Sequence, residues 1–118
     1  MIVDDSRSFL EAARVLLERE GLTVAAVASS GAEAIGHAVR YRPDVVLVDI
    51  SLGGESGLEL ARRLVDDASG DGPIVILIST HAEADFADLI AESPAAGFLP
   101  KAELSARAIR RIVDGRVR

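Results

Sequence analysis

Two uninterrupted runs of apolar residues, at 45–48 (Val-Val-Leu-Val) and 74–78 (Ile-Val-Ile-Leu-Ile), constrain the fold of this chain most strongly. Both runs are rich in β-branched residues, have the length of a strand and do not alternate with polar residues. A strand of this kind is buried on both faces, which is typical of a parallel sheet covered by helices on each side. The chain has 118 residues, of which 49% are hydrophobic, so it has the size of a single domain and can bury such a core.

Helical patterns alternate with the predicted strands. Five strands are expected at residues 1–3, 22–28, 45–48, 74–78 and 97–99, and a helical pattern follows each of them. The first helix is expected from about Ser6 to Glu20, and Ser30 with Glu33 forms a capping box before the second. A Gly-rich loop is expected at 53–57 and a polar loop at 69–72. Alternation with right-handed crossovers predicts an α/β fold with a doubly wound, five-stranded parallel sheet.

Charge and composition argue against several functional classes. The formal net charge is −6, with 19 acidic residues against 13 basic ones, which argues against a nucleic-acid domain built on phosphate contacts. Cysteine is absent, so disulfides and thiolate chemistry are excluded. The apolar runs are too short for a membrane span or a secretory signal. Among the 13 basic residues, Lys101 is the only lysine; codon bias in a GC-rich genome explains the arginines but not the remaining lysine.

Polar side chains gather where the predicted strands end, which is the edge where ligands bind in doubly wound sheets. The residues at these strand ends are Asp4, Asp5, Asp49, Ser79 or Thr80, and Lys101. Clustered carboxylates need a cation, and oxygen-only ligands favour Mg²⁺. A carboxylate can attack phosphorus, and phosphoryl transfer needs positive charge on the phosphoryl oxygens, which a metal and a lysine supply. Taken singly, each residue is more often a helix cap, a turn residue or a solvated charge. Their joint placement favours an acyl phosphate formed on Asp49.

Over its whole length, the sequence resembles the receiver domain of bacterial two-component response regulators, the CheY-like superfamily. The matching features are the acidic pair Asp4-Asp5, the apolar run into Asp49, Gly57 eight residues later, the strand into Ser79, and the segment 97–101 (Gly-Phe-Leu-Pro-Lys). The resemblance implies a flavodoxin-like (βα)5 fold with strand order 2-1-3-4-5. It also implies a single receiver domain over residues 1–118, whose first strand looks truncated at its amino end.

The resemblance implies a role for each site residue. Asp49 is expected to be the phosphoacceptor, and Mg²⁺ is expected to be held by Asp4, Asp5, Asp49 and the backbone carbonyl of Ser51. The remaining roles are those of the switch hydroxyl, the switch aromatic and the phosphate partner, expected at Ser79, Phe98 and Lys101. Thr80 is expected to narrow access for a phosphodonor, or to supply the hydroxyl itself if the strand slips by one residue. His81 either tunes the lifetime of the phosphoryl group or is an ordinary surface-loop histidine.

The residue after Lys101 departs from the family. Receiver domains often have proline there, with a cis peptide bond, whereas this chain has Ala102. A cis bond before alanine would cost about 3 kcal/mol or more, so a trans bond is favoured on energy.

The function implied is that of a phosphoacceptor in a two-component phosphorelay. It would take a phosphoryl group from a histidine kinase or phosphotransfer protein, catalyse only its own phosphorylation and dephosphorylation, and switch the face formed by the fourth helix, fifth strand and fifth helix. The alternative is a pseudo-receiver that binds partners without phosphorylation. A DNA-binding output domain in a longer chain and a phosphorylation-dependent homodimer are further expectations. So are a cytoplasmic location, no membrane contact and no direct binding of nucleic acid by this domain.

Two other classes fit less well. A phosphatase-type enzyme also uses an aspartate nucleophile and Mg²⁺, but would want a second Asp two residues beyond it, where this chain has Ser51. A flavodoxin-like cofactor binder would want a phosphate-cradling loop after the first strand and aromatic side chains to stack on the ring, whereas aromatics make up only 3% of this chain. Five arginines make the last helix basic, either as a solvated face or as a docking surface for an acidic partner: Arg107, Arg110, Arg111, Arg116 and Arg118.

Overall fold

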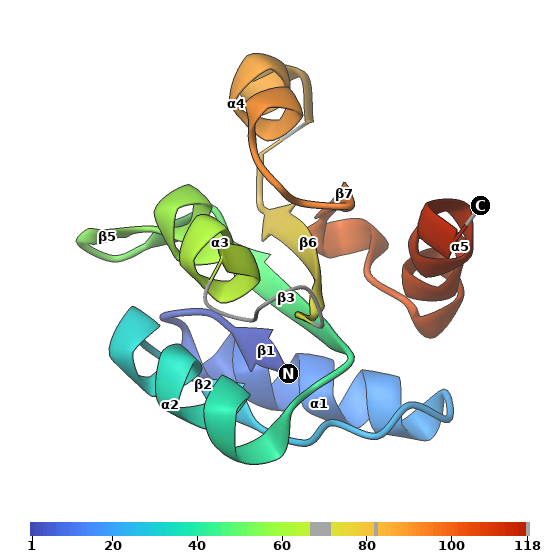
Figure 1. Cartoon of the computed structure of the whole chain (residues 1–118). Helices are drawn as coiled ribbons and strands as arrows, with labels where there is room; N and C mark the ends of the chain where they lie inside the picture. Colours follow the sequence, from blue (N-terminus) through green and yellow to red (C-terminus); the bar gives the residue numbers. More distant parts are fainter. Residues whose placement is uncertain (67–71, 82, 118) are drawn as a thin grey trace.

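A five-stranded parallel sheet forms the centre of the computed structural model, which describes residues 1–66, 72–81 and 83–117 (Figure 1). The strands lie in the order β2-β1-β3-β6-β7. Their bounds in that order are Val27–Ala28, Ile2–Val3, Val45–Asp49, Ile74–Ser79 and Gly97–Pro100. Counted within this sheet, the order is second, first, third, fourth, fifth. The doubly wound α/β fold and the order 2-1-3-4-5 are therefore confirmed.

Strands β3 and β6 make the longest pairing and carry the two apolar runs. They pair over five positions, from Val45 opposite Ile74 to Asp49 opposite Ile78. Side chains of β6 alternate between two cores: Val75 and Leu77 belong to one, and Ile76 and Ile78 to the other. Because both faces of the strand are buried, every side chain must be apolar, which explains why the run lacks alternation.

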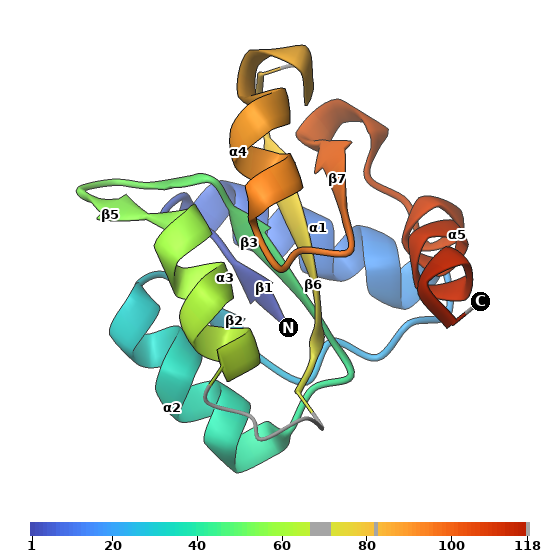
Figure 2. The same cartoon turned by 45° about the horizontal axis from the view of Figure 1, so that its top comes forward.

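Five helices cover the two faces of the sheet (Figure 2). Their bounds are α1 Arg7–Arg19, α2 Gly31–Tyr41, α3 Gly57–Asp66, α4 Ala87–Glu92 and α5 Ala106–Val117, with short 3₁₀ helices at Glu83–Phe86 and Lys101–Glu103. Side chains of α2 and α3 pack into the core that contains Val75, and α4 lies against it. Side chains of α1 and α5 pack into the core that contains Ile76.

The helix starts follow the predicted caps closely. Ser6 caps α1, and its Oγ accepts a hydrogen bond from Phe9 N at 3.3 Å. Ser30 caps α2, and its Oγ accepts from Glu33 N at 3.2 Å. The return contact of the capping box is displaced by one residue, because Glu33 Oε1 accepts from Ser29 N at 2.7 Å.

Two segments differ from the sequence-based expectation. The second strand covers only Val27–Ala28, because its partner β1 is two residues long and offers no ladder to residues 22–26. The Gly-rich loop contains a small antiparallel hairpin of β4 (Ser51–Leu52) and β5 (Glu55–Ser56). Gly53 in its turn has φ of +62°, a conformation that glycine adopts without steric cost. Of the loop expected at 69–72, residues 69–71 lie outside the described residues.

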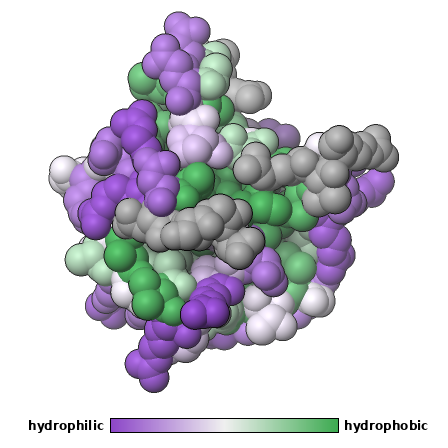
Figure 3. Space-filling view, viewed as in Figure 1, coloured by the Kyte–Doolittle hydropathy of each residue, from purple (hydrophilic) through white to green (hydrophobic). Residues whose placement is uncertain are grey.

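Hydrophilic residues surround most of the face shown in Figure 3, with apolar residues towards its middle. Within the described ranges, no helix combines the length and the apolar character needed to cross a membrane. The bond between Lys101 and Ala102 is trans, as the energetic argument favoured.

Candidate functional site

Two carboxylates and the only lysine meet where β1, β3 and β7 end. Asp4 follows β1, Asp49 is the last residue of β3, and Lys101 follows β7. The Lys101 Nζ lies 2.5 Å from Asp4 Oδ2 and 3.0 Å from Asp49 Oδ2. The predicted gathering of these residues at the carboxyl edge of the sheet is present in the structure.

Asp4 is fully buried, and its two carboxylate oxygens have different partners. Asp4 Oδ1 accepts a hydrogen bond from Ser6 N at 2.9 Å, which fixes the carboxylate to the start of α1. Asp4 Oδ2 is buried, and its partner is the Lys101 ammonium, whose Nζ lies 2.5 Å away. A buried carboxylate oxygen without a donor is costly unless a cation compensates it.

The Lys101 ammonium is held in its charged form by its neighbours. Burial by itself lowers the pKa of Lys101, but the hydrogen bonds and charges of Asp4 and Asp49 outweigh it and raise the pKa above its ordinary value. The Nζ also lies over the ring of Phe9, 4.4 Å from the ring centroid. The only lysine is therefore a fixed positive charge among acidic groups.

Three carboxylates could hold a small cation together. Each of Asp4, Asp5 and Asp49 offers one oxygen, and these oxygens lie within 4.8 Å of one another. Asp5 is exposed, so the cluster opens to solvent, whereas Asp4 and Asp49 are buried. Three carboxylates gathered in this way fit Mg²⁺ by their chemistry. Ser51 lies beside them, with its N–H donating to Asp49 Oδ1 at 3.1 Å; the metal role of its carbonyl remains a prediction.

Two side chains at the end of β6 could supply the predicted switch hydroxyl, one buried and one exposed. Ser79 is the last residue of β6 and is buried, and its Oγ accepts a hydrogen bond from His81 N at 3.0 Å. Thr80 follows the strand and is exposed, with its Oγ1 3.5 Å from His81 Nδ1. The exposed His81 ring meets Phe86 edge-on, with the centroids 5.9 Å apart.

Phe98 lies in β7 opposite Leu77 and is 8% exposed. It belongs to the same core as Val48 and Leu77. The aromatic side chain expected to switch thus occupies a buried position in this structure.

Gly57 packs against the backbone at the end of β3. Its N–H donates to Ile50 O at 2.8 Å, and Ile50 N in turn donates to Ile78 O at 3.0 Å. A Cβ added to Gly57 would lie 1.8 Å from the carbonyl oxygen of Asp49. The backbone approach at this position therefore requires glycine.

Sequence reasoning missed two side chains near the site. Phe9 falls inside the first predicted helix, and its contact with Lys101 joins residues far apart in the chain. Glu55 accepts from Gly31 N through both carboxylate oxygens at 3.2 Å, which ties the β4–β5 hairpin to the first turn of α2. The one available signal was the Gly-Gly pair at 53–54 between short strand-like segments, which is typical of a tight hairpin.

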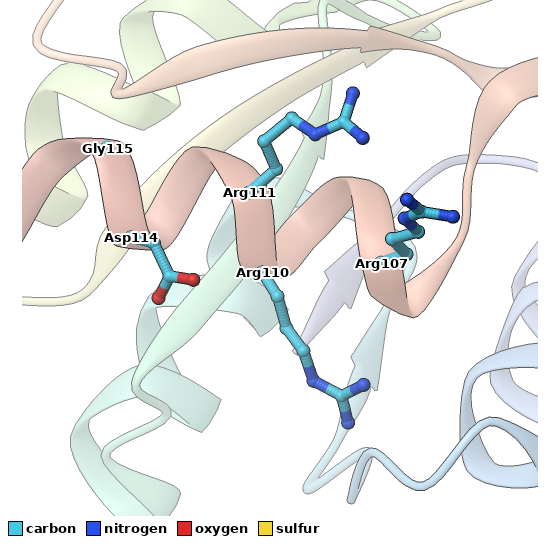
Figure 4. A pocket seen from close by; sticks show the side chains of 5 residues that line it. All are labelled: Arg107, Arg110, Arg111, Asp114 and Gly115. Carbon is cyan, nitrogen blue, oxygen red and sulfur yellow. The ribbon is translucent and has the colours of Figure 1, made fainter.

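A separate hollow of about 730 Å³ lies along α5. Its walls are Arg107, Arg110, Arg111, Asp114 and Gly115. Figure 4 shows the three arginine side chains pointing in different directions from the helix, so they do not converge on one point. Of the five arginines in the basic-helix prediction, Arg118 and the side chain of Arg116 lie outside what the structure describes.

Comparison with known proteins gives one consistent result. Residues 1–114 match the sequence model of the response regulator receiver domain. A putative transcriptional regulator of Pseudomonas aeruginosa is 35% identical over 103 residues, which cover 87% of this chain and 49% of that protein. Protein-glutamate methylesterase/protein-glutamine glutaminase 3 of Hahella chejuensis is 35% identical over 85 residues, which cover 72% of this chain and 24% of that protein. The chain therefore spans about half, or less, of the length of these two relatives.

Among solved structures, the signal receiver domain of the putative response regulator NarL from Mycobacterium tuberculosis is similar, with a TM-score of 0.80 and 29% sequence identity. The match covers 96% of this chain and 90% of that one. Sequence and structure thus agree on the same kind of domain.

Proposed function

This chain belongs to the response regulator receiver domain family, and from that premise we propose that it accepts a phosphoryl group on Asp49. The observation that carries the proposal is the Lys101 ammonium, which bridges the carboxylates of Asp4 and Asp49 at the ends of three strands. The donor would be the phosphohistidine of a histidine kinase or of a phosphotransfer protein.

The reaction begins with an attack by a carboxylate oxygen of Asp49 on phosphorus. A P–O bond forms, the P–N bond to the donor imidazole breaks, and the electron pair of that bond returns to the imidazole. The Ser51 N–H, which donates to Asp49 Oδ1 at 3.1 Å, orients the carboxylate. The Lys101 ammonium, 3.0 Å from Asp49 Oδ2, is close enough to stabilise negative charge on a phosphoryl oxygen as it develops.

The acidic residues of the site fit Mg²⁺. Asp4, Asp5 and Asp49 would hold the ion with their carboxylates, and Ser51 with its backbone carbonyl. The donor set supports this assignment, because the oxygens of the three carboxylates lie within 4.8 Å of one another and Mg²⁺ prefers oxygen ligands. When bound, Mg²⁺ would supply positive charge to the phosphoryl oxygens. This domain would act as a signalling module and catalyse only its own phosphorylation and dephosphorylation.

Switching would follow from the hydroxyl of Ser79. Its Oγ accepts from His81 N, which leaves its own proton free to be donated to a phosphoryl oxygen. Movement of Ser79 towards the phosphoryl group would change the space next to β7, where Phe98 lies buried. This change would shift the equilibrium between two conformations of the face formed by α4, β7 and α5. Thr80, which is exposed, would restrict access for the donor rather than act as the switch.

We propose that the domain that carries out the response is not part of residues 1–118. Because the chain spans about half or less of the relatives described above, we propose that it works with an output domain, such as a DNA-binding one, in a longer protein. A cytoplasmic location and a phosphorylation-dependent homodimer belong to the same proposal.

The test is phosphorylation with a small-molecule donor, phosphoramidate, in the presence of Mg²⁺. Intact mass should reveal one phosphoryl group on the wild-type chain, labile to acid and to alkali as an acyl phosphate is, and none on Asp49→Asn. Asp66→Asn, at the end of α3, is the matched control and should behave as wild type. Incorporation in Asp49→Asn would refute the acceptor, and no incorporation in the wild type would favour the pseudo-receiver.

A further inference from the structure

We propose that Phe9 is a positioning residue whose ring face holds the Lys101 ammonium in place at the carboxylate site. This inference rests on the proposed function and deepens it. Phe9 lies in the first turn of α1, and Lys101 Nζ lies over its ring at 4.4 Å from the centroid. That separation is well within the range at which a cation is attracted to the face of an aromatic ring.

The ammonium is enclosed by three groups. Asp4 and Asp49 contact it on their Oδ2 atoms, and Phe9 covers it with a ring. The side chain of Lys101 is 14% exposed. A lysine side chain has four flexible carbons and loses conformational entropy when it is fixed, so a third contact that limits its positions would keep the charge where a phosphoryl oxygen must meet it.

The position of the ring depends on the same carboxylate that pairs with the ammonium. Asp4 Oδ1 accepts from Ser6 N at 2.9 Å, and Ser6 Oγ accepts from Phe9 N at 3.3 Å. Asp4 Oδ2 then faces Lys101. Asp4, Ser6, Phe9 and Lys101 thus form a closed chain of contacts. The start of α1 places the ring over the cation because both are anchored to one buried side chain.

Apolar packing alone would be the simpler role of Phe9. The ring is partly buried and packs against the core that contains Leu10 and Ile2. Leucine would supply similar apolar contact, but only an aromatic ring presents a negative face to a cation. Phe9→Leu and Phe9→Tyr therefore separate the two roles.

The contact itself is tested by NMR on the metal-free chain, without any reaction. Lys101 is the only lysine, so its Cε proton signals are free of overlap with other lysines. We expect an upfield ring-current shift of these signals in the wild type and in Phe9→Tyr, and its loss in Phe9→Leu. An absent shift in the wild type, or an unchanged shift in Phe9→Leu, would overturn the inference.

The positioning role is tested by the affinity for beryllofluoride in Mg²⁺. The Phe9→Leu variant should bind beryllofluoride about two- to tenfold more weakly than the wild type, and the Phe9→Tyr variant should bind it as the wild type does. Tyr41→Leu on α2, whose ring lies 5.3 Å from the Arg40 guanidinium, is the matched control and should change nothing. In a Lys101→Met background, Phe9→Leu should have no further effect. An equal loss in that background would mean that Phe9 acts by packing alone, against the inference.

These results also separate the inference from the proposed function. A wild-type chain that takes up neither beryllofluoride nor phosphoryl groups would contradict the proposed function, while the NMR measurement would still decide whether Phe9 fixes Lys101. A wild-type chain that takes up both, with Phe9→Leu equal to it, would overturn only the inference.

Discussion

Gly57 rests against Asp49 so closely that a Cβ on the glycine would lie 1.8 Å from the aspartate carbonyl oxygen. The glycine is the first residue of α3, and Asp49 is the last residue of β3. The helix α3 therefore starts in direct contact with the backbone that presents the Asp49 side chain. Any side chain at position 57 must push these two segments apart.

We expect Gly57→Ala to lower the free energy of unfolding by about 3 kcal/mol, because the overlap is with backbone that cannot move aside. Urea denaturation measures the change. Gly36→Ala is the matched control: it lies inside α2 with nothing within 4 Å of the added Cβ, and should stabilise the chain by up to about 1 kcal/mol. Similar losses in both variants would rule out the steric explanation.

Lys101→Arg should impair switching more than phosphorylation itself. The ammonium is a compact charge enclosed by Asp4, Asp49 and Phe9, and the broad planar guanidinium has no room to reproduce all three contacts. Intact mass measures phosphoryl uptake, and phosphorylation-dependent NMR shifts of the Phe98 ring measure the switch.

The reverse exchange at an exposed ion pair, Arg14→Lys on α1, serves as its control and should leave both readouts unchanged. Full-sized spectral changes in Lys101→Arg would mean that a guanidinium serves the site equally well.

His81→Ala should shorten the lifetime of the aspartyl phosphate several-fold. The variant keeps the backbone N–H that donates to Ser79 Oγ and removes only the ring, which packs edge-on against Phe86 beside the site. Loss of the ring admits water more easily. The decay of bound phosphoryl group measures the lifetime, and His37→Ala on α2 is the control. An unchanged lifetime would make His81 an ordinary surface-loop residue.

In a polypeptide that starts at Met1, the amino-terminal ammonium is expected to give stability a pH dependence near neutrality. Burial lowers the pKa of the Met1 ammonium to about 6, against a smaller opposing effect of Asp44. Since the folded-state pKa lies below the unfolded one, this group's contribution to stability is present at pH 8 and is lost as the pH falls through 6. The expected loss is about 2–3 kcal/mol. Urea midpoints at pH 8.5 and 5.5 measure it.

An acetylated amino terminus provides the comparison for that experiment, because it has no charge to bury. The difference between the two chains isolates the contribution of Met1 from that of every other group. If both chains lost the same stability on acidification, Met1 would not be the cause.

The sequence predicted most of the fold because the strongest signals came from the most buried segments. The runs at β3 and β6 predict parallel strands, and Ser6 and Ser30 mark helix starts that depend on local hydrogen bonds. The second strand was predicted too long, because residues 22–28 are apolar apart from Thr23, while pairing depends on β1, a remote segment. The β4–β5 hairpin was missed because its strands are two residues long.

The candidate site was predicted as a set of residues but not as a geometry. Topology alone brings Asp4, Asp49 and Lys101 to one edge of the sheet, since parallel strands end together. No periodicity indicates which oxygen of Asp4 meets the ammonium, or that Phe9 covers it. These contacts depend on side-chain directions set by distant packing.

The burial of Lys101 has a practical consequence for labelling chemistry. A polypeptide of residues 1–118 carries two primary amines, the Met1 amino terminus and Lys101. The first donates to Val45 O at 2.9 Å, and the second is enclosed by carboxylates and a ring. Neither is freely available to an acylating reagent, so the rate of amine acylation at Lys101 reports how often the carboxylate site opens. One mass spectrum then distinguishes an occupied site from an empty one without an introduced probe.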